Sequence, residues 1–381
     1  MPAPRRRDGA PVRARADACP GAWRRHDAAD GALARFRPVG GAIAPAELRL
    51  LADASDTAAD AAPLELTSRG SWQVRGLTVK GADDLAAALA AVGGPAPLLD
   101  DQGRDVPCSV VASPRSRAVD APARAIADAL RGRTDVPGRL LVAVDDGTGD
   151  VLGLDADVAV VLGTPARLHL AGAPTDIPAA GPTAGPTADP AGLALAAIEA
   201  FLAVRGDAWR VAEVGAAAVL GALRTREQKR VLEHAEVLTC AERTCVEVLP
   251  RLGEVTPAAA RVLADLGDEG AALRVTPWRT VVLRDPPDDA RERLAAHVET
   301  GPSRWASLSA CVGAPRCAKS HTDVRGDLAR AVATGRAGGL LHAHWVGCAR
   351  ACGTPAGPVA VVEGTPGGTY RTIVRTGRVS G

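Results

Sequence analysis

The chain has 381 residues, which is enough for two or three domains with hydrophobic cores of their own. Lys and Arg total 45 against 44 for Asp and Glu, a formal net charge of +1, so no global charge favours nucleic acid or an anionic membrane as a partner. Any anionic ligand must therefore be held by a local group of arginines.

The first 28 residues are expected to form a flexible, basic N-terminus. The opening stretch, MPAPRRRDGAPVRARA, is rich in Pro and Arg and lacks the apolar segment of a secretory signal. No run of about 18 uncharged apolar residues occurs in the sequence, so we predict no membrane span. We expect a cytoplasmic protein with reduced thiols, in which eight cysteines favour metal or redox chemistry over disulfides.

The segments that follow predict an α+β fold. PAELRLLADASD (45–56) reads as a helix with Pro at its first position. LELTSR (64–69) and WQVRGL (72–77) read as strands. Residues 171–190 form a Pro/Gly/Ala/Thr linker, which we expect to be extended and mobile. A helix at 191–204 follows it.

The second half of the chain repeats the first. GAIAPAELRLLAD (41–53) matches GEVTPAAARVLAD (253–265), and each leads into a strand-like run that reaches a threonine, Thr67 or Thr276. GRLLVAVDDG (138–147) likewise matches GGLLHAHWVG (338–347). Chance similarity in a biased composition is the alternative, but order and spacing agree across both pairs.

Only the C-terminal copy contains the cysteines. VVASPRS (110–116) parallels CVGAPRC (311–317), so Cys311 corresponds to Val110 and Cys317 to Ser116. The second pairing sets Cys348 against Thr148 and Cys352 against Leu152. The N-terminal copy therefore reads as a partner that lacks the metal ligands and completes the structure.

The cysteine pattern predicts one [4Fe–4S] cluster on Cys311, Cys317, Cys348 and Cys352. Thiolates are the usual ligands of such clusters, and four complete the cubane. Structural zinc normally uses closer pairs, and zinc, disulfides and unligated thiols stay open as weaker alternatives. The other four cysteines are interpreted as packing or incidental thiols: Cys19, Cys108, Cys240 and Cys245.

Basic residues around the repeated strands and the cysteines suit carboxylate binding, because a guanidinium group can bind a carboxylate with two hydrogen bonds. The candidate substrate-binding residues are Arg69, Arg75, Arg279 and Lys319. His321, His342 and His344 could bind an iron or move protons, although ordinary hydrogen-bonded histidines are the commoner case. No dinucleotide or P-loop motif occurs, so reducing equivalents are expected from a separate reductase or electron donor.

These motifs together resemble the sulfite/nitrite reductase superfamily. Within it, the phrases CPGAWRRHDAADGALARFRPVGGAI (19–43), LRVTPWRTVVL, SACVGAPRCA and HWVGCARACG are most similar to the precorrin-3B synthase family of aerobic cobalamin biosynthesis. The chain is short for a sirohaem reductase, and CARAC lacks the Pro-Asn usual between those cysteines in sulfite and nitrite reductases. The resemblance covers about residues 18–363.

The resemblance implies an internally duplicated fold of two ferredoxin-like half-domains plus two α/β cluster-type domains, of which only the C-terminal one keeps the cysteines. The resulting division is a flexible N-terminus (1–28), a first half-domain (29–95), a cysteine-free cluster-type domain (96–170), a linker (171–190), a second half-domain (191–295) and a [4Fe–4S]-binding domain (296–381).

The resemblance also implies an activity. It is the hydroxylation of precorrin-3A at C20 by O2, with formation of a γ-lactone, by an oxidoreductase that holds a [4Fe–4S] cluster and a mononuclear non-haem iron. The alternative is an assimilatory sulfite or nitrite reductase that uses sirohaem, in which the residue at the position of Cys352 would bridge the cluster and the sirohaem. A non-catalytic electron-transfer or tetrapyrrole-binding protein is the third hypothesis.

Overall fold

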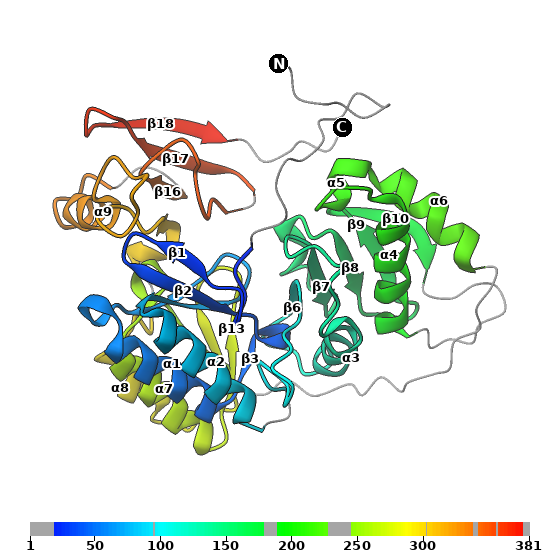
Figure 1. The fold of residues 1–381 in the computed structure, drawn as a ribbon, viewed down its shortest axis with the longest axis horizontal. Helices are drawn as coiled ribbons and strands as arrows, with labels where there is room; N and C mark the ends of the chain where they lie inside the picture. The colour runs from blue at the N-terminus through cyan, green and yellow to red at the C-terminus, as the bar shows by residue number, and fades with distance from the viewer. Residues whose placement is uncertain are drawn as a thin grey trace.

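The structure is a computed structural model, which describes residues 19–93, 96–178, 189–227, 245–301, 303–337, 342–355 and 357–375. Figure 1 shows three lobes: a core of two half-domains, an α/β domain beside it, and a C-terminal α/β domain above it. Among the described residues, no helix is both long and apolar enough to cross a membrane. The fold is a mixed α+β architecture, as the sequence predicts.

The first half-domain is an antiparallel sheet covered by two helices. Its strands are β1 (His26–Ala28), β2 (Gly31–Phe36), β4 (Leu64–Leu66) and β5 (Trp72–Leu77), and its helices are α1 (Pro45–Thr57) and α2 (Val79–Ala91). Residues 72–75 of β5 alternate between the two faces of the sheet, before a register shift in the pairing with β2. Trp72 and Val74 pack in the core against the helices, whereas Gln73 and Arg75 point to the opposite face. That opposite face forms one wall of the cavity described below.

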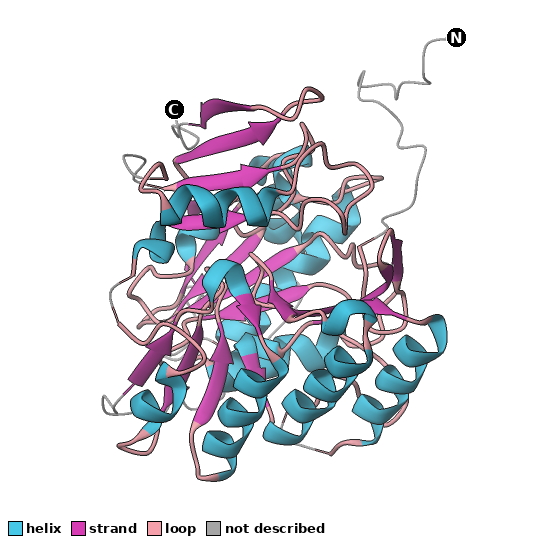
Figure 2. Cartoon of the chain, turned by 90° about the vertical axis from the view of Figure 1, so that its left-hand side faces the viewer, coloured by secondary structure: helices cyan, strands magenta, loops and turns pink. Residues whose placement is uncertain are grey.

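The second half-domain repeats this plan. Its strands are β11 (Cys245–Val248), β13 (Ala272–Val275) and β14 (Val281–Arg284), and its helices are α7 (Pro257–Asp268) and α8 (Ala290–Ala295). The halves exchange short strands: β3 (Ala42–Ile43) pairs with β13, and β12 (Glu254–Val255) pairs with β4. Figure 2 shows helices gathered along the lower side of the molecule, with strands above them.

Matching contacts in the two halves confirm the duplication. Arg49 on α1 forms ion pairs with Asp265 and Asp268 on α7, and Arg261 on α7 forms ion pairs with Asp53 and Asp56 on α1. The residues that the repeat aligns therefore form equivalent ion pairs, which a pseudo-twofold axis relates.

The turns that follow β4 and β13 are also equivalent. The Thr67 N–H donates to the Ser71 carbonyl at 2.9 Å, and the Thr276 N–H donates to the Thr280 carbonyl at 3.0 Å. In both turns the threonine hydroxyl accepts the returning N–H at 3.1 Å. The turn residues thus satisfy their own backbone groups, which explains why threonine stands at both positions.

The cysteine-free α/β domain has a sheet in the order β10-β9-β8-β7-β6. Its elements are β6 (Ser109–Ala112), α3 (Asp120–Leu130), β7 (Leu141–Asp145), β8 (Val158–Val161), β9 (Arg167–Leu170), β10 (Ala173–Pro178), α4 (Pro190–Val204), α5 (Val211–Val214) and α6 (Ala216–Glu227). The strands β6, β7 and β8 are parallel and fully buried, which explains their continuous apolar sequences.

Two details differ from the sequence prediction. The segment taken as a linker from residue 171 begins with strand β10, while its residues 179–188 lie outside the described part of the chain. The helix after it, α4, was assigned to the second half-domain, but it packs against α3, α6 and β8 of the cysteine-free domain. The helix is apolar on nearly every face, so it needs cover on several sides, and its sequence does not say which domain provides that cover.

The structure also changes the last residue of the predicted flexible N-terminus, 1–28. Residues 1–18 lie outside the described part, but residues 26–28 form β1, an ordered edge strand of the first sheet. The predicted flexible segment therefore ends before His26.

The cysteine-bearing α/β domain has the same strand pattern as its cysteine-free counterpart. It contains β15 (Leu308–Ala310), α9 (Val324–Ala333), β16 (Ala343–Val346), β17 (Val359–Gly364) and β18 (Tyr370–Arg375). As in the other domain, the first three strands are parallel and the next is antiparallel. Asp323 caps α9, because its carboxylate accepts the Gly326 N–H at 3.1 Å.

The structure corrects both pairings of the α/β repeat, and it sets Trp345 against Val144 instead of Asp145. The Cys311 N–H donates to the Trp345 carbonyl, and the Ser113 N–H makes the same bond to Val144 in the other copy. Cys311 therefore corresponds to Ser113, because Val110 lies inside β6. The loop from 311 to the α9 cap is longer than its counterpart, 113–119, so an alignment without gaps shifts the pairing.

Candidate active site

One cavity of about 810 Å³ brings the predicted residues together. All four cysteines predicted as cluster ligands line it, as do all four predicted substrate-binding residues. Cys311 follows β15 and Cys348 follows β16 by one glycine. Because β15 and β16 are parallel, their carboxyl ends meet at one edge of the sheet, and this places the two cysteine loops side by side.

The local backbone explains how the loops reach the cavity. Gly313, between the first two cysteines, has a φ of +72°, and a Cβ there would lie 2.8 Å from the Val324 nitrogen. Only glycine fits such a tight turn against the start of α9. The Gly347 N–H donates to the Cys311 Sγ at 3.3 Å. Burial raises the pKa of the Cys311 thiol, and the N–H groups of Gly347 and Gly313 oppose this by favouring the thiolate.

The donor set fits a [4Fe–4S] cluster better than a single ion. Among the described residues, no three His, Cys, Asp or Glu side chains converge closely enough to bind one metal ion. A single zinc needs four ligands at about 2.3 Å from one centre, whereas a cubane binds four thiolates at four separate irons. Four cysteines spread around one cavity have the chemistry that a cubane requires.

The same finding bears on the mononuclear iron that the resemblance implies. No group of three suitable side chains occurs in the described ranges, so these residues offer no ligand set for such an iron. The three histidines differ in their exposure to solvent. His321 and His342 are exposed, whereas His344 is fully buried in β16.

The wall of the cavity carries more cationic side chains than carboxylates, although Arg37, Arg75, Arg316 and Arg325 are each ion-paired with a carboxylate. Ten cationic side chains line it against two carboxylates, those of Asp27 and Glu65. The cationic residues are Arg35, Arg37, Arg69, Arg75, Arg139, Arg279, Arg316, Arg325, Arg350 and Lys319. In a chain with a formal net charge of +1, this concentration is the local arginine group that an anionic ligand needs.

Arg69 and Arg279 carry charge that no carboxylate neutralises by direct contact in the described part of the chain. The Arg69 Nη1 donates to the Arg139 carbonyl at 2.9 Å, and the Arg279 Nη2 donates to the Gly353 carbonyl at 2.7 Å. Burial lowers the pKa of Arg69, and burial, with Arg325 nearby, lowers the pKa of Arg279 to about 10. Both side chains stay protonated at neutral pH and favour an anion beside them.

Arg75 has a different environment. Its guanidinium binds both carboxylate oxygens of Asp30, at 3.0 and 2.9 Å, and donates to the Arg316 carbonyl at 3.1 Å. Its charge is already paired, so Arg75 braces the loop that contains Cys317. Its counterpart in the repeat, Arg284, binds Asp120 and the Pro114 carbonyl in the same way.

Lys319 lies between Cys317 and α9, with its side chain exposed at the cavity. No hydrogen bond or ion pair of Lys319 is found among the described residues. An exposed, flexible ammonium at this position suits an incoming carboxylate.

His344 contacts a predicted ligand. Its Nε2 lies 3.0 Å from the Cys352 carbonyl oxygen, and its Nδ1 lies 2.8 Å from the Ser309 Oγ. Burial lowers the pKa of His344 to about 4, so the ring is neutral at physiological pH. His342, by contrast, is exposed and lines the second cavity described below.

The remaining cysteines divide into two groups. Cys108 is fully buried in the cysteine-free domain, where burial raises the pKa of its thiol to about 12. Cys245 begins strand β11, not a helix, and Cys240 lies outside the described residues. Cys19, by contrast, lines the same cavity as the predicted cluster cysteines.

Several cavity residues were not predicted. Arg35 on β2 and Arg37 just after it alternate with the core residues Ala34 and Phe36. The Glu65 carboxylate accepts a hydrogen bond from Gln73 at 2.7 Å and forms an ion pair with Arg325 at 2.9 Å. Alternation of polar and apolar residues along these strands was the available signal. It marks a polar sheet face, which here borders the cavity.

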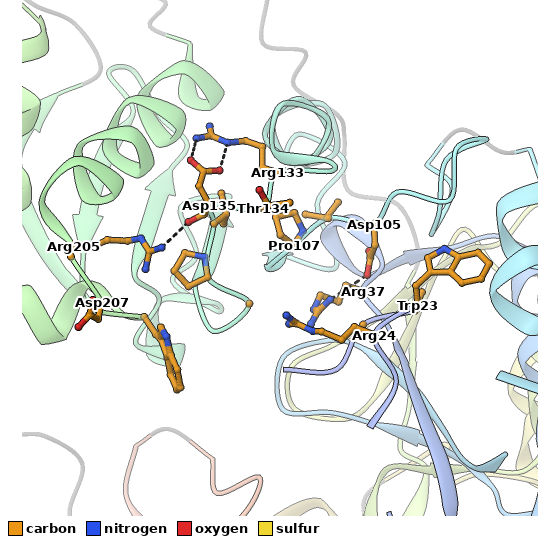
Figure 3. A pocket seen from close by; sticks show the side chains of 18 residues that line it. Trp23, Arg24, Arg37, Asp105, Pro107, Arg133, Thr134, Asp135, Arg205 and Asp207 are labelled. Carbon is orange, nitrogen blue, oxygen red and sulfur yellow. Dashed lines mark hydrogen bonds and ion pairs between the residues drawn. The ribbon is translucent and has the colours of Figure 1, made fainter. Parts of the chain in front are cut away.

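A second cavity of about 740 Å³ adjoins the first, since Ser68, Arg69 and Arg279 line both. A third, of about 730 Å³, lies between the first half-domain and the cysteine-free domain (Figure 3). Two of its arginines are ion-paired, Arg37 with Asp105 and Arg133 with Asp135, and no residue predicted for the cluster or the substrate lines it. The cavity with the cysteines is therefore the candidate active site.

Comparison with known proteins bears on the fold. Residues 26–92 match the Nitrite/Sulfite reductase ferredoxin-like half domain family. The structure is similar to that of the NirA protein of Mycobacterium tuberculosis, with 20% sequence identity, a TM-score of 0.63, and coverage of 91% of this chain and 74% of that one. No curated protein sequence matches. The chain therefore has a mixed α+β fold that is similar to that of the NirA protein.

Proposed function

We propose that the protein is an oxidoreductase that carries one [4Fe–4S] cluster on Cys311, Cys317, Cys348 and Cys352 and uses O2 to hydroxylate a polycarboxylate tetrapyrrole, in the manner of a precorrin-3B synthase. The supporting observation is the single cavity that four cysteines and ten cationic side chains line together. A tetrapyrrole rimmed with acetates and propionates needs such a set of cations.

The protein's own residues would bind and orient the substrate. A bound cluster supplies single electrons, which the reaction of O2 with closed-shell carbon requires. Arg69 and Arg279 would each bind one substrate carboxylate, because each presents guanidinium N–H groups at the cavity wall with no ion-paired carboxylate among the described residues. Lys319 would bind a third at the rim. We leave Arg75 out of this set, since Asp30 already pairs with it.

The balance of the reaction requires an external donor. One oxygen atom of O2 becomes the C20 hydroxyl and the other leaves as water, which consumes two electrons and two protons. The ring A acetate oxygen adds to the ring carbon next to C20 as the double bond between these carbons is consumed, so the γ-lactone closes without loss of a second water. Because the sequence has no dinucleotide motif, we propose a separate reductase or electron carrier as the donor.

Turnover of precorrin-3A tests this function. Anaerobically purified protein, supplied with an electron carrier and its reductase, should consume O2 only when precorrin-3A is present. The product should contain one additional oxygen atom by mass spectrometry. Lack of O2 uptake by protein that contains its full cluster would contradict the oxygenase.

The ligand assignment has its own test. Cys311→Ser and Cys348→Ser should each remove the visible absorbance and most of the iron, because each breaks one of four iron–thiolate bonds. Cys245→Ser, on strand β11 outside the cavity, is the matched control and should keep both. Unchanged iron and sulfide in both ligand variants would exclude this cysteine set.

The match of residues 26–92 favours a second candidate, a sirohaem-dependent reductase of sulfite or nitrite. Sirohaem is itself a polycarboxylate tetrapyrrole, so the same cationic cavity suits it. The reductase would retain sirohaem through purification and reduce sulfite or nitrite with a chemical donor. The oxygenase would do neither.

A further inference from the structure

The loop that contains the fourth cysteine is held by a buried imidazole. We infer that His344 is a positioning residue for Cys352: its Nε2–H fixes the Cys352 carbonyl and so sets the direction in which the Cys352 thiolate meets the cluster. This inference deepens the proposed function, because it rests on the cluster proposed there.

The hydrogen bonds define one tautomer of the ring. The Cys352 carbonyl oxygen, 3.0 Å from Nε2, can only accept a hydrogen bond, so Nε2 must carry the proton. The Nδ1 then accepts from the Ser309 hydroxyl at 2.8 Å. Ser309 and His344 are register partners on the parallel strands β15 and β16. With 0% of its surface exposed, the ring cannot reorient into solvent.

The adjoining carbonyl is held from the opposite half of the molecule. The Arg279 Nη2 donates to the Gly353 carbonyl at 2.7 Å, and Gly353 turns the chain with a φ of +76°. Two consecutive carbonyls of the loop therefore have buried donors, one within the domain and one from the second half-domain. Hydrogen bonds of this kind orient metal ligands, and their loss typically reduces metal affinity 10- to 100-fold.

The cysteine-free copy has a different residue at the position equivalent to His344. Trp345 corresponds to Val144, because each carbonyl accepts the equivalent N–H, so His344 corresponds to Ala143. In that copy the Asp145 carboxylate fastens the loop by accepting the N–H groups of Gly147 and Gly149 at 2.8 and 3.0 Å. The imidazole thus occurs in the copy with the cysteines, where it supports a ligand loop.

Two substitutions separate positioning from mere packing. His344→Val removes the donor but suits a buried strand, as do its neighbours Val346 and Val361. His344→Gln keeps an amide N–H that can reach the same carbonyl. His169→Val makes the same change on β9 of the cysteine-free domain and serves as the control. For each anaerobically purified protein, we would measure the visible circular dichroism, the reduction potential and the rate of cluster loss in air.

We expect His344→Val to fold, to change the visible dichroism and the potential, and to lose its cluster about tenfold faster. His344→Gln should restore much of the wild-type behaviour, and His169→Val should match wild type. The inference fails if His344→Val retains the wild-type dichroism, potential and rate of loss, or if His344→Gln behaves no better than valine. Absence of iron and sulfide from the wild-type protein would instead overturn the proposed cluster itself.

Discussion

Among the described residues, no carboxylate forms an ion pair with Arg69, so its charge is available to an anionic ligand. It lines two adjoining cavities, and its hydrogen bond goes to a backbone carbonyl. Arg69→Ala should weaken the binding of uroporphyrin, a stable polycarboxylate probe, about tenfold, because a hydrogen bond to a charged group contributes about 1.5–3 kcal/mol. Fluorescence titration measures this, and the cluster absorbance should not change. Arg224→Ala, an exposed ion pair on the cysteine-free domain, is the control, and equal losses in both variants would remove Arg69 from the site.

Asp105 makes stability depend on pH. It is buried beside Arg37, with 3.2 Å between the charged atoms, and burial raises its pKa to about 6 despite that arginine. The unfolded value is about 3.9, so the folded chain binds the proton more tightly. The stability that Asp105 contributes is therefore complete below about pH 4 and is lost as the pH rises through 6.

Asp105→Asn removes this titration. Chemical denaturation of both proteins between pH 4 and pH 7 should show the free energy of unfolding of the wild type falling relative to the variant. The fall should be about 1.4 kcal/mol for each unit of pKa difference. A difference between the two proteins that is constant over this range would contradict the assignment.

At the scale of elements, one of the two equivalent turns contains a residue with a strained backbone conformation. Arg279 has a φ of +65°, and the matching position of the first turn is Gly70, with a φ of +61°. A side chain in this left-handed region costs about 1–2 kcal/mol. The strain persists because Arg279 reaches both cavities and the Gly353 carbonyl.

A matched pair of variants measures that strain. Both Arg279→Gly and Arg279→Ala remove the guanidinium, but only glycine relieves the backbone. We expect the glycine variant to be more stable than the alanine variant by about 1 kcal/mol, and both to bind uroporphyrin more weakly than wild type. Equal free energies of unfolding, measured in urea, would show that the turn is not strained.

At the scale of the whole molecule, the duplication governs what the sequence can predict. Repeated motifs and periodicity predict the helices that begin at Pro45 and Pro257 and the strands around Thr67 and Thr276. The spacing of the four cysteines predicts that they share one site. The bidentate partner of Arg75, Asp30, does not follow, because a strand pattern shows which face a side chain occupies but not what it meets there.

Other features depend on packing between segments far apart in the sequence. Helix α4 joins the cysteine-free domain because α3, α6 and β8 together cover its apolar surface. The equivalence of Cys311 with Ser113 depends on hydrogen bonds to the neighbouring strand. Local propensity determines neither arrangement, since both are set by tertiary contacts.

The central claim is that one cavity holds a [4Fe–4S] cluster beside a binding site for a polycarboxylate tetrapyrrole. It is tested most directly by the absorption spectrum and the iron and sulfide content of protein purified without air. We predict about four irons and four sulfides per chain, with a broad cluster band and no sirohaem bands. A colourless protein that contains zinc would contradict the cluster, and sharp sirohaem bands would replace the oxygenase with a sulfite or nitrite reductase.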